Sequence, residues 1–77
     1  MDDAYRVCED VARHLGVPIG RVVLTYRVHS AEDGGPAWSV NVERQEGRRT
    51  VGYHASAEKL RDVSAEFVVM LARRAAR

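Results

Sequence analysis

The sequence has few cysteines and prolines and no long hydrophobic run, and each shortage narrows what the chain can be. It has one cysteine, Cys8, and two prolines among 77 residues. A single cysteine cannot form a disulfide within the chain and suits a reducing compartment, so we expect a cytoplasmic protein. The longest apolar run, residues 67–72, is far shorter than the ~20 residues that span a bilayer. The chain starts with two acids, Asp2 and Asp3, and lacks the basic start and apolar stretch of a secretory signal. We therefore expect no targeting segment and no membrane contact.

The length and composition indicate one small folded domain covering residues 1–77. The chain has 45% hydrophobic and 30% charged residues with a net charge of +1, whereas disordered chains combine low apolar content with high net charge. A domain of this size buries only about 60% of the surface of its unfolded chain. We therefore expect a partner or a second copy to add to its stability.

Apolar spacing predicts the secondary structure of the first half. Apolar residues recur at helical spacing from Ala4 to Leu15, and Gly16 is a suitable residue to end that helix. From residue 22 to 30 the period changes to two, which predicts a half-buried strand. Residues 31–36 have a loop composition, and alternation resumes from residue 38 to 43 as a second strand.

The second half predicts one more strand and one more helix. A short turn at residues 45–48, around Gly47, leads into a strand over 49–54. Ser56 is then a good N-cap for a helix from about Ala57 to the last arginines. The predicted fold class is α+β, in the order α-β-β-β-α, with a three-stranded antiparallel sheet covered on one face by two helices.

The sequence offers no constellation for catalysis or metal binding. His14, His29 and His54 come from three separate elements, and there is no Cys-x-x-Cys or His-x-x-x-His spacing. Residues 34–36, Gly-Gly-Pro, stand between two strands and not before a helix, which argues against a phosphate-binding loop. Cys8 lies on the apolar stripe of the first helix and is expected to pack there. We expect no enzyme activity, cofactor, metal or small-molecule substrate.

The last helix has a wider apolar arc than one sheet face can cover. Ala65, Val68 and Ala72 extend the core stripe around one flank, and Val69 lies on the far side. In one interpretation the alanines are merely good helix formers and the first helix packs on Val68. In the other, these four residues form a partner or dimer surface together with Tyr53 of the third strand.

The last third of the chain is its only cationic part. Arg48, Arg49, Lys59 and Arg61 could contact nucleic-acid phosphates, with Arg21 or Arg27 assisting. Because acids are interspersed among these bases, the sequence slightly favours an ordinary solvated surface over a nucleic-acid footprint.

Several groups of residues resemble the pattern of a known family. They are Tyr26-Arg27-Val28 in the first strand, Gly35-Pro36 in the next loop, the aromatic-led Trp38-Ser39-Val40-Asn41-Val42, Gly52 with Ser56, and Ala65 with Leu71. In this order and spacing they resemble the double-stranded RNA-binding domain. The resemblance covers nearly the whole chain and implies the α-β-β-β-α fold.

The family's RNA-contact positions differ here. Where the family has a K-K-x-A-K pattern, this chain has Ala57-Glu58-Lys59-Leu60-Arg61, and the first hairpin carries Glu32 and Asp33. Members that lack the lysines serve in protein–protein contacts through the third strand and last helix. The resemblance thus implies a non-enzymatic interaction module that binds a second copy or another protein, with double-stranded RNA binding as the alternative.

Overall fold

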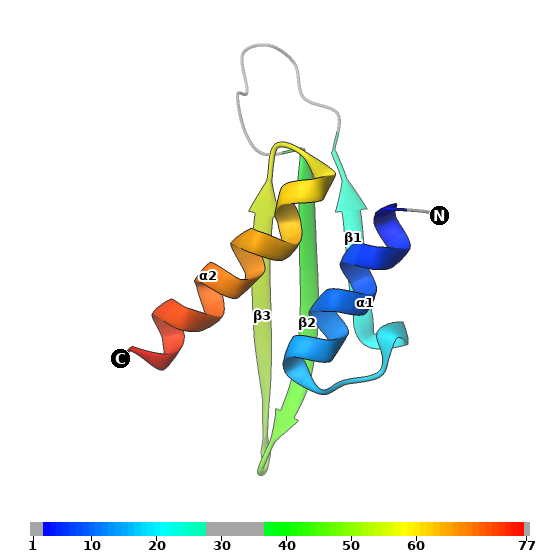
Figure 1. Ribbon diagram of the computed structural model, residues 1–77. Coiled ribbons are helices and arrows are strands. Elements are labelled where there is room, and N and C mark those ends of the chain that lie inside the picture. Colours follow the sequence, from blue (N-terminus) through cyan, green and yellow to red (C-terminus); the bar gives the residue numbers. More distant parts are fainter. Residues whose placement is uncertain (1–2, 28–36, 77) are drawn as a thin grey trace.

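The structure is a computed structural model that describes residues 3–27 and 37–76, and it confirms the predicted order of elements (Figure 1). The main elements are helix α1 (Asp3–Leu15), strands β1 (Val22–Tyr26), β2 (Trp38–Glu46) and β3 (Arg49–Ala57), and helix α2 (Val63–Ala75). Short 3₁₀ turns, Ile19–Arg21 and Leu60–Asp62, precede β1 and α2.

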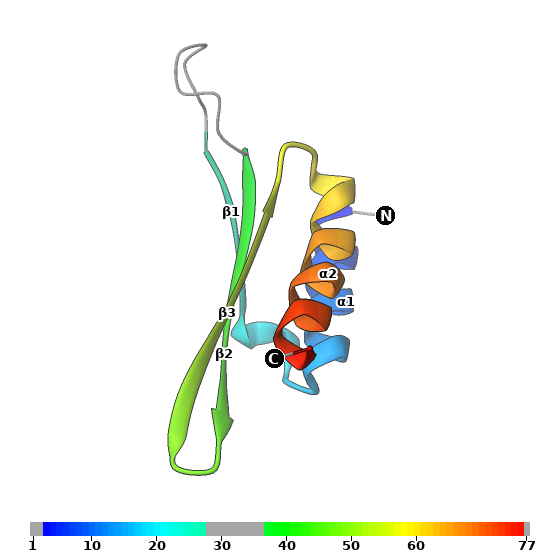
Figure 2. The same ribbon diagram turned by 90° about the vertical axis from the view of Figure 1, so that its left-hand side faces the viewer.

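The three strands form one antiparallel sheet in the order β1-β2-β3. Seen edge-on in Figure 2, both helices lie on the same side of this sheet, so among the described elements nothing covers its other face, here called the open face. The predicted α+β class with one covered face is therefore confirmed. β1 and β3 each have one free edge, because each pairs only with β2 among the described strands.

The core lies between the sheet and the two helices. Val11 of α1, Val40 of β2, and Val63 and Phe67 of α2 have no exposed surface. The alternation of β2 and β3 directs their apolar residues inward, which is the period-two pattern of a sheet with one covered face. The helical stripe meets them from the other side.

The β2–β3 hairpin has a tighter turn than predicted. Glu46 pairs with Arg49, so only Gly47 and Arg48 form the connection and the predicted turn at 45–48 is too long. Gly47 has a φ of 66°, which suits a glycine at the first central position of a two-residue hairpin turn. The pairing continues β2 as far as Glu46.

The start of the last helix differs from the prediction. Ser56 does not cap a helix: it lies in β3 opposite Ser39 of β2, and β3 continues to Ala57. Ala57 is only 8% exposed, so its burial and its pairing with β2 favour the strand over the local capping preference. α2 begins later, at Val63, after the 3₁₀ turn.

Some predicted features lie outside the described residues. They are the end of the first strand beyond Arg27, the loop 31–36 with its glycines and acids, and His29. Across the two described ranges, neither helix has the length and apolarity needed to cross a membrane.

Candidate interaction surface on α2 and β3

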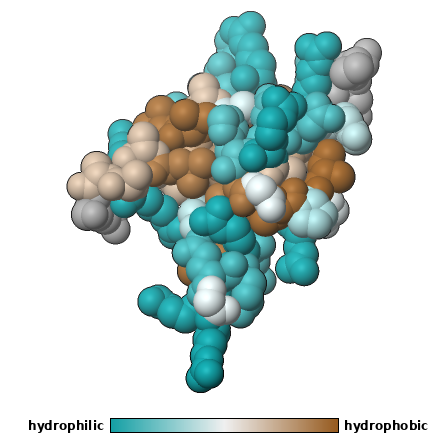
Figure 3. Space-filling model, turned by 60° about the horizontal axis from the view of Figure 1, so that its bottom comes forward, coloured by the Kyte–Doolittle hydropathy of each residue, from teal (hydrophilic) through white to brown (hydrophobic). Residues whose placement is uncertain are grey.

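Four small or branched apolar residues form an exposed strip along α2, here called the outer ridge: Ala65, Val68, Val69 and Ala72. Val68 is 42% exposed and Val69 is 41% exposed, whereas Phe67, next to them in sequence, is fully buried. At 100° per residue, Ala65 and Val69 lie nearly opposite the buried Phe67, while Val68 lies on the flank of the helix. Figure 3 shows hydrophobic surface over α2, at the left of the view.

The first helix does not cover Val68, as one interpretation of the sequence required. α1 and α2 meet instead at Ser64, whose hydroxyl oxygen lies 3.4 Å from a carboxylate oxygen of Asp10. Val68 follows Ser64 by four residues, about one helical turn, and it is exposed. The structure therefore leaves Ala65, Val68, Val69 and Ala72 exposed along α2, which is the exposure that the alternative interpretation requires.

A groove of about 230 Å³ runs between α2 and the free edge of β3. Val69 and Met70 form its apolar wall on the helix, with Glu66 towards one end and Arg73 towards the other. Residues 54–56 of β3 form the opposite wall. The outer ridge thus continues, through Val69, into a groove that has both apolar and charged groups.

The backbone of β3 has an alternating pattern that decides what its free edge offers. Because Glu46 and Arg49 flank a two-residue turn, the odd-numbered residues of β3 bond to β2 and the even-numbered ones point away. Arg74 of α2 donates a hydrogen bond to one of these outward carbonyls, that of Gly52, at 2.9 Å. The groove lies beyond this contact, beside the outward backbone groups of His54 and Ser56.

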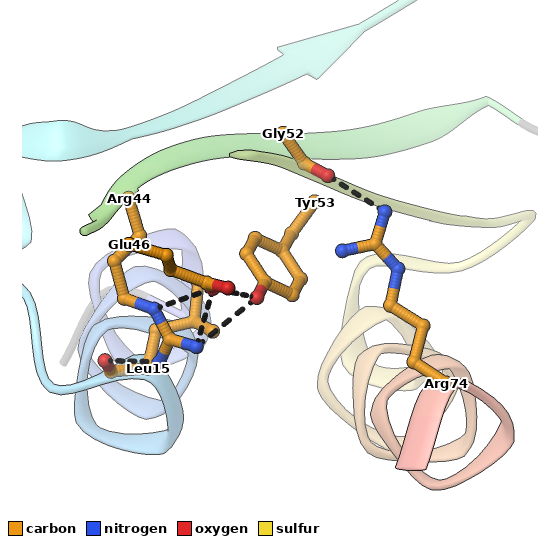
Figure 4. A network of polar contacts seen from close by, with 6 residues as sticks. All are labelled: Leu15, Arg44, Glu46, Gly52, Tyr53 and Arg74. Atoms are coloured by element: carbon orange, nitrogen blue, oxygen red, sulfur yellow. Dashed lines mark hydrogen bonds and ion pairs between the residues drawn. The ribbon is translucent and has the colours of Figure 1, made fainter. Parts of the chain in front are cut away.

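Tyr53 does not share this surface, although the sequence analysis grouped it with the ridge. Its position in β3 directs the ring towards the helices, and only 7% of the residue is exposed. Its hydroxyl donates a hydrogen bond to the Glu46 carboxylate and accepts one from Arg44 at 3.0 Å (Figure 4). Tyr53 is therefore a core residue and not a contact residue.

The polar cluster around Tyr53 fixes the hairpin against α1. Arg44 donates to the backbone carbonyl of Leu15 at 2.9 Å and forms an ion pair with Glu46 at 2.7 Å. The hydrogen bond from Tyr53, together with that from Arg44, lowers the pKa of Glu46. Sequence reasoning missed this cluster, because residues 44 and 46 gave no signal beyond alternating polarity.

The basic residues of the alternative hypothesis fall into two separate pairs. Arg48 and Arg49 are at the β2–β3 turn, while Lys59 and Arg61 follow the other end of β3 (Figure 1). β3 spans Arg49–Ala57, and at ~3.3 Å per residue the pairs stand at least ~25 Å apart. Arg61 also lies 4.0 Å from Asp62. The four residues do not form one continuous basic patch.

No metal-binding cluster accompanies these surfaces in the described part of the chain. Within residues 3–27 and 37–76, no group of three or more histidine, cysteine, aspartate or glutamate residues is placed to hold a metal ion. No family model, curated protein or solved structure matches the chain. The arrangement of the described residues is thus the basis for a functional hypothesis.

Proposed function

We propose that this protein is a non-enzymatic interaction module, of the cytoplasm, that pairs with a second copy of itself through the outer ridge of α2 and the adjoining edge of β3. The observation that carries the proposal is the exposure of two neighbouring valines, Val68 and Val69, at about two fifths of their surface each. Their exposure supports a contact surface because contiguous exposed apolar residues favour association.

The outer ridge is self-complementary, which favours a second copy as the partner. Val68 and Val69 occupy its middle and an alanine stands at each end, so an antiparallel α2–α2 pair places Ala65 of one copy near Ala72 of the other. On the groove side the same arrangement brings Glu66 towards Arg73. A two-fold dimer requires such a surface, because each contact occurs twice. Small residues at both ends let the two helices approach closely.

The size of the chain supports the same proposal. A 77-residue domain with few fully buried large residues gains stability from burying further apolar surface. The resemblance to double-stranded RNA-binding domains without the lysine pattern points to the same elements, the third strand and the last helix. Because the ridge is short, we expect a reversible dimer whose population rises with protein concentration.

Sedimentation equilibrium of the chain and of Val69→Asp tests this function. The parent chain is expected to approach twice the monomer mass as its concentration rises, and Val69→Asp is expected to remain monomeric. Val23→Asp is a matched control, because Val23 is 57% exposed on the open face of the sheet; it is expected to dimerise like the parent. A parent that stays monomeric at millimolar concentration, or an unaffected Val69→Asp variant, would contradict the proposal.

Duplex RNA binding has less support, because the four basic residues are divided between the two ends of β3. To test this alternative, a duplex of ~16 base pairs, the span that such domains contact, is added to the chain in the same sedimentation experiment. Salt-dependent binding that Arg61→Glu weakens would favour RNA over self-association.

A further inference from the structure

The free edge of β1 is a second place where backbone groups are available, on the opposite side of the sheet from β3. The N–H of Arg27 donates to the carbonyl of Ala37 at 2.7 Å, so this pair is a hydrogen-bonded one. In an antiparallel ladder such pairs alternate. The backbone N–H and C=O groups of Val22, Leu24 and Tyr26 therefore point away from β2.

This edge is unprotected in the part of the chain that the structure describes. At β3, Arg74 donates a hydrogen bond to the outward carbonyl of Gly52. This contact makes the edge less available for pairing with another strand. β1 has β2 as its only described neighbour in the sheet. Its edge is thus a template to which an extended segment can add by main-chain hydrogen bonds.

An apolar hollow lies beside the same edge, on the helix side of the sheet. It has a volume of about 500 Å³ and is lined by Ala4, Tyr5 and Cys8 of α1, by Ile19 and by Leu24. Tyr5 is 54% exposed and Ile19 is 36% exposed. A strand added to β1 directs every second side chain into this hollow, so those side chains are expected to be apolar.

The charges at the two ends of β1 define what flanks those apolar residues. Arg21 and Arg27 are both exposed. Arg27 continues the ladder of β1 by pairing with Ala37 and has the parity of Val23, while Arg21, in the 3₁₀ turn before β1, lines a hollow on the open face together with Val23 and Asn41. Neither forms an ion pair with a residue that the structure describes. Acidic residues directly opposite them are favourable, and basic residues there are unfavourable.

A second copy of the chain is a poor occupant of this edge. The register that pairs the whole of β1 with itself, Leu24 opposite Leu24, places Arg21 opposite Arg27 of the other copy twice. Like charges directly across a strand pair are destabilising. Other registers avoid this contact only by shortening the paired segment.

From these observations we propose that the β1 edge binds an extended segment of another protein, antiparallel to β1, with alternating apolar residues between two acidic ones. Its backbone pairs with Val22, Leu24 and Tyr26, and its apolar side chains enter the hollow between α1 and β1. Its acids lie opposite Arg21 and Arg27. This surface is independent of the outer ridge of α2.

The test uses a capped heptapeptide of sequence Glu-Val-Thr-Leu-Thr-Val-Glu and a matched control in which lysine replaces both glutamates. In an NMR titration of the whole chain, the acidic peptide is expected to shift the amide signals of residues 22–26. It is also expected to slow exchange of the Val22, Leu24 and Tyr26 amides. The lysine peptide is expected to bind at least about tenfold more weakly, because two attractive pairs become repulsive.

Two further arms separate edge pairing from nonspecific attraction. The double variant Arg21→Glu, Arg27→Glu is expected to reverse the preference and bind the lysine peptide. N-methylation of the second, fourth and sixth peptide residues, whose N–H groups face β1, is expected to abolish binding, whereas methylation of the third and fifth is expected to retain it.

Equal binding of the acidic and lysine peptides, or insensitivity to the position of N-methylation, would overturn the proposal. So would signal changes centred on α2, or a dimer of the chain alone that protects the β1 amides. Val69→Asp is expected to bind the acidic peptide like the parent chain, so failure of self-association through α2 and failure of this proposal give different results.

Discussion

Arg74 and Tyr53 form a stacked pair that joins α2 to β3. The central guanidinium carbon of Arg74 lies 4.3 Å from the centre of the Tyr53 ring, and the same guanidinium donates to the neighbouring Gly52 carbonyl at 2.9 Å. On the other side of the ring, the guanidinium carbon of Arg44 lies 5.2 Å from its centre (Figure 4). The ring is thus held between two arginines, one from α2 and one from β2.

Arg74→Ala is predicted to lower the free energy of unfolding by about 1 kcal/mol, since it removes one cation–π contact and one hydrogen bond. Urea unfolding of the monomeric chain measures this change. Arg73→Ala is the matched control, because Arg73 precedes it in the same helical turn, lies in the groove and is not paired with the ring. Its effect is expected to stay within about 0.5 kcal/mol. Equal effects of the two substitutions would show that the stacked pair does not contribute to the free energy of unfolding.

Glu46 is predicted to make folding sensitive to acid. Because the hydrogen bond from Tyr53 lowers its pKa in the folded state, the folded chain gains stability from this carboxylate at neutral pH. That gain is lost as the pH falls below the ordinary pKa of the group, 4.5. The urea midpoint of the parent is expected to fall more steeply between pH 5 and pH 3 than that of Glu46→Gln.

Glu43→Gln is the control for this acid sensitivity. Glu43 lies on the open face of the same strand and takes no part in the cluster around Tyr53. Its replacement is expected to leave the dependence of the urea midpoint on pH the same as in the parent. If the urea midpoint of Glu46→Gln falls with pH as steeply as that of the parent, Glu46 is not the source of the acid sensitivity.

The parts of the fold that local periodicity determines were predictable from the sequence. Apolar residues from Ala4 to Leu15 repeat at helical spacing, and the alternation at residues 38–43 has the period of a strand. The exposure of Val68 and Val69 follows from the same arithmetic, because a helix that buries Phe67 directs its neighbours elsewhere. These features need no knowledge of distant contacts.

The parts that depend on pairing between distant segments could not be predicted in this way. Whether Ser56 caps a helix or extends a strand depends on the length of β2, which offers Ser39 as its partner. The separation of Arg48 from Lys59 depends on which end of β3 each one occupies. The role of Tyr53 depends on Arg44 and Glu46, which reach it across the hairpin. The spacing of residues along the sequence does not specify which distant residues pair in the sheet.

The position of Ser56 in β3 gives a prediction that separates the two interpretations of this residue. Ser56→Ala would cost about 1 kcal/mol if the hydroxyl capped a helix, but at a half-exposed strand position we expect a change below about 0.5 kcal/mol. Ser56→Thr is expected to stabilise the chain slightly, because β-branched residues favour strands. Urea unfolding of both variants measures these effects, and backbone chemical shifts of residues 55–57 report the local structure. Helical shifts there, or a large loss in Ser56→Ala, would show that the serine begins the helix after all.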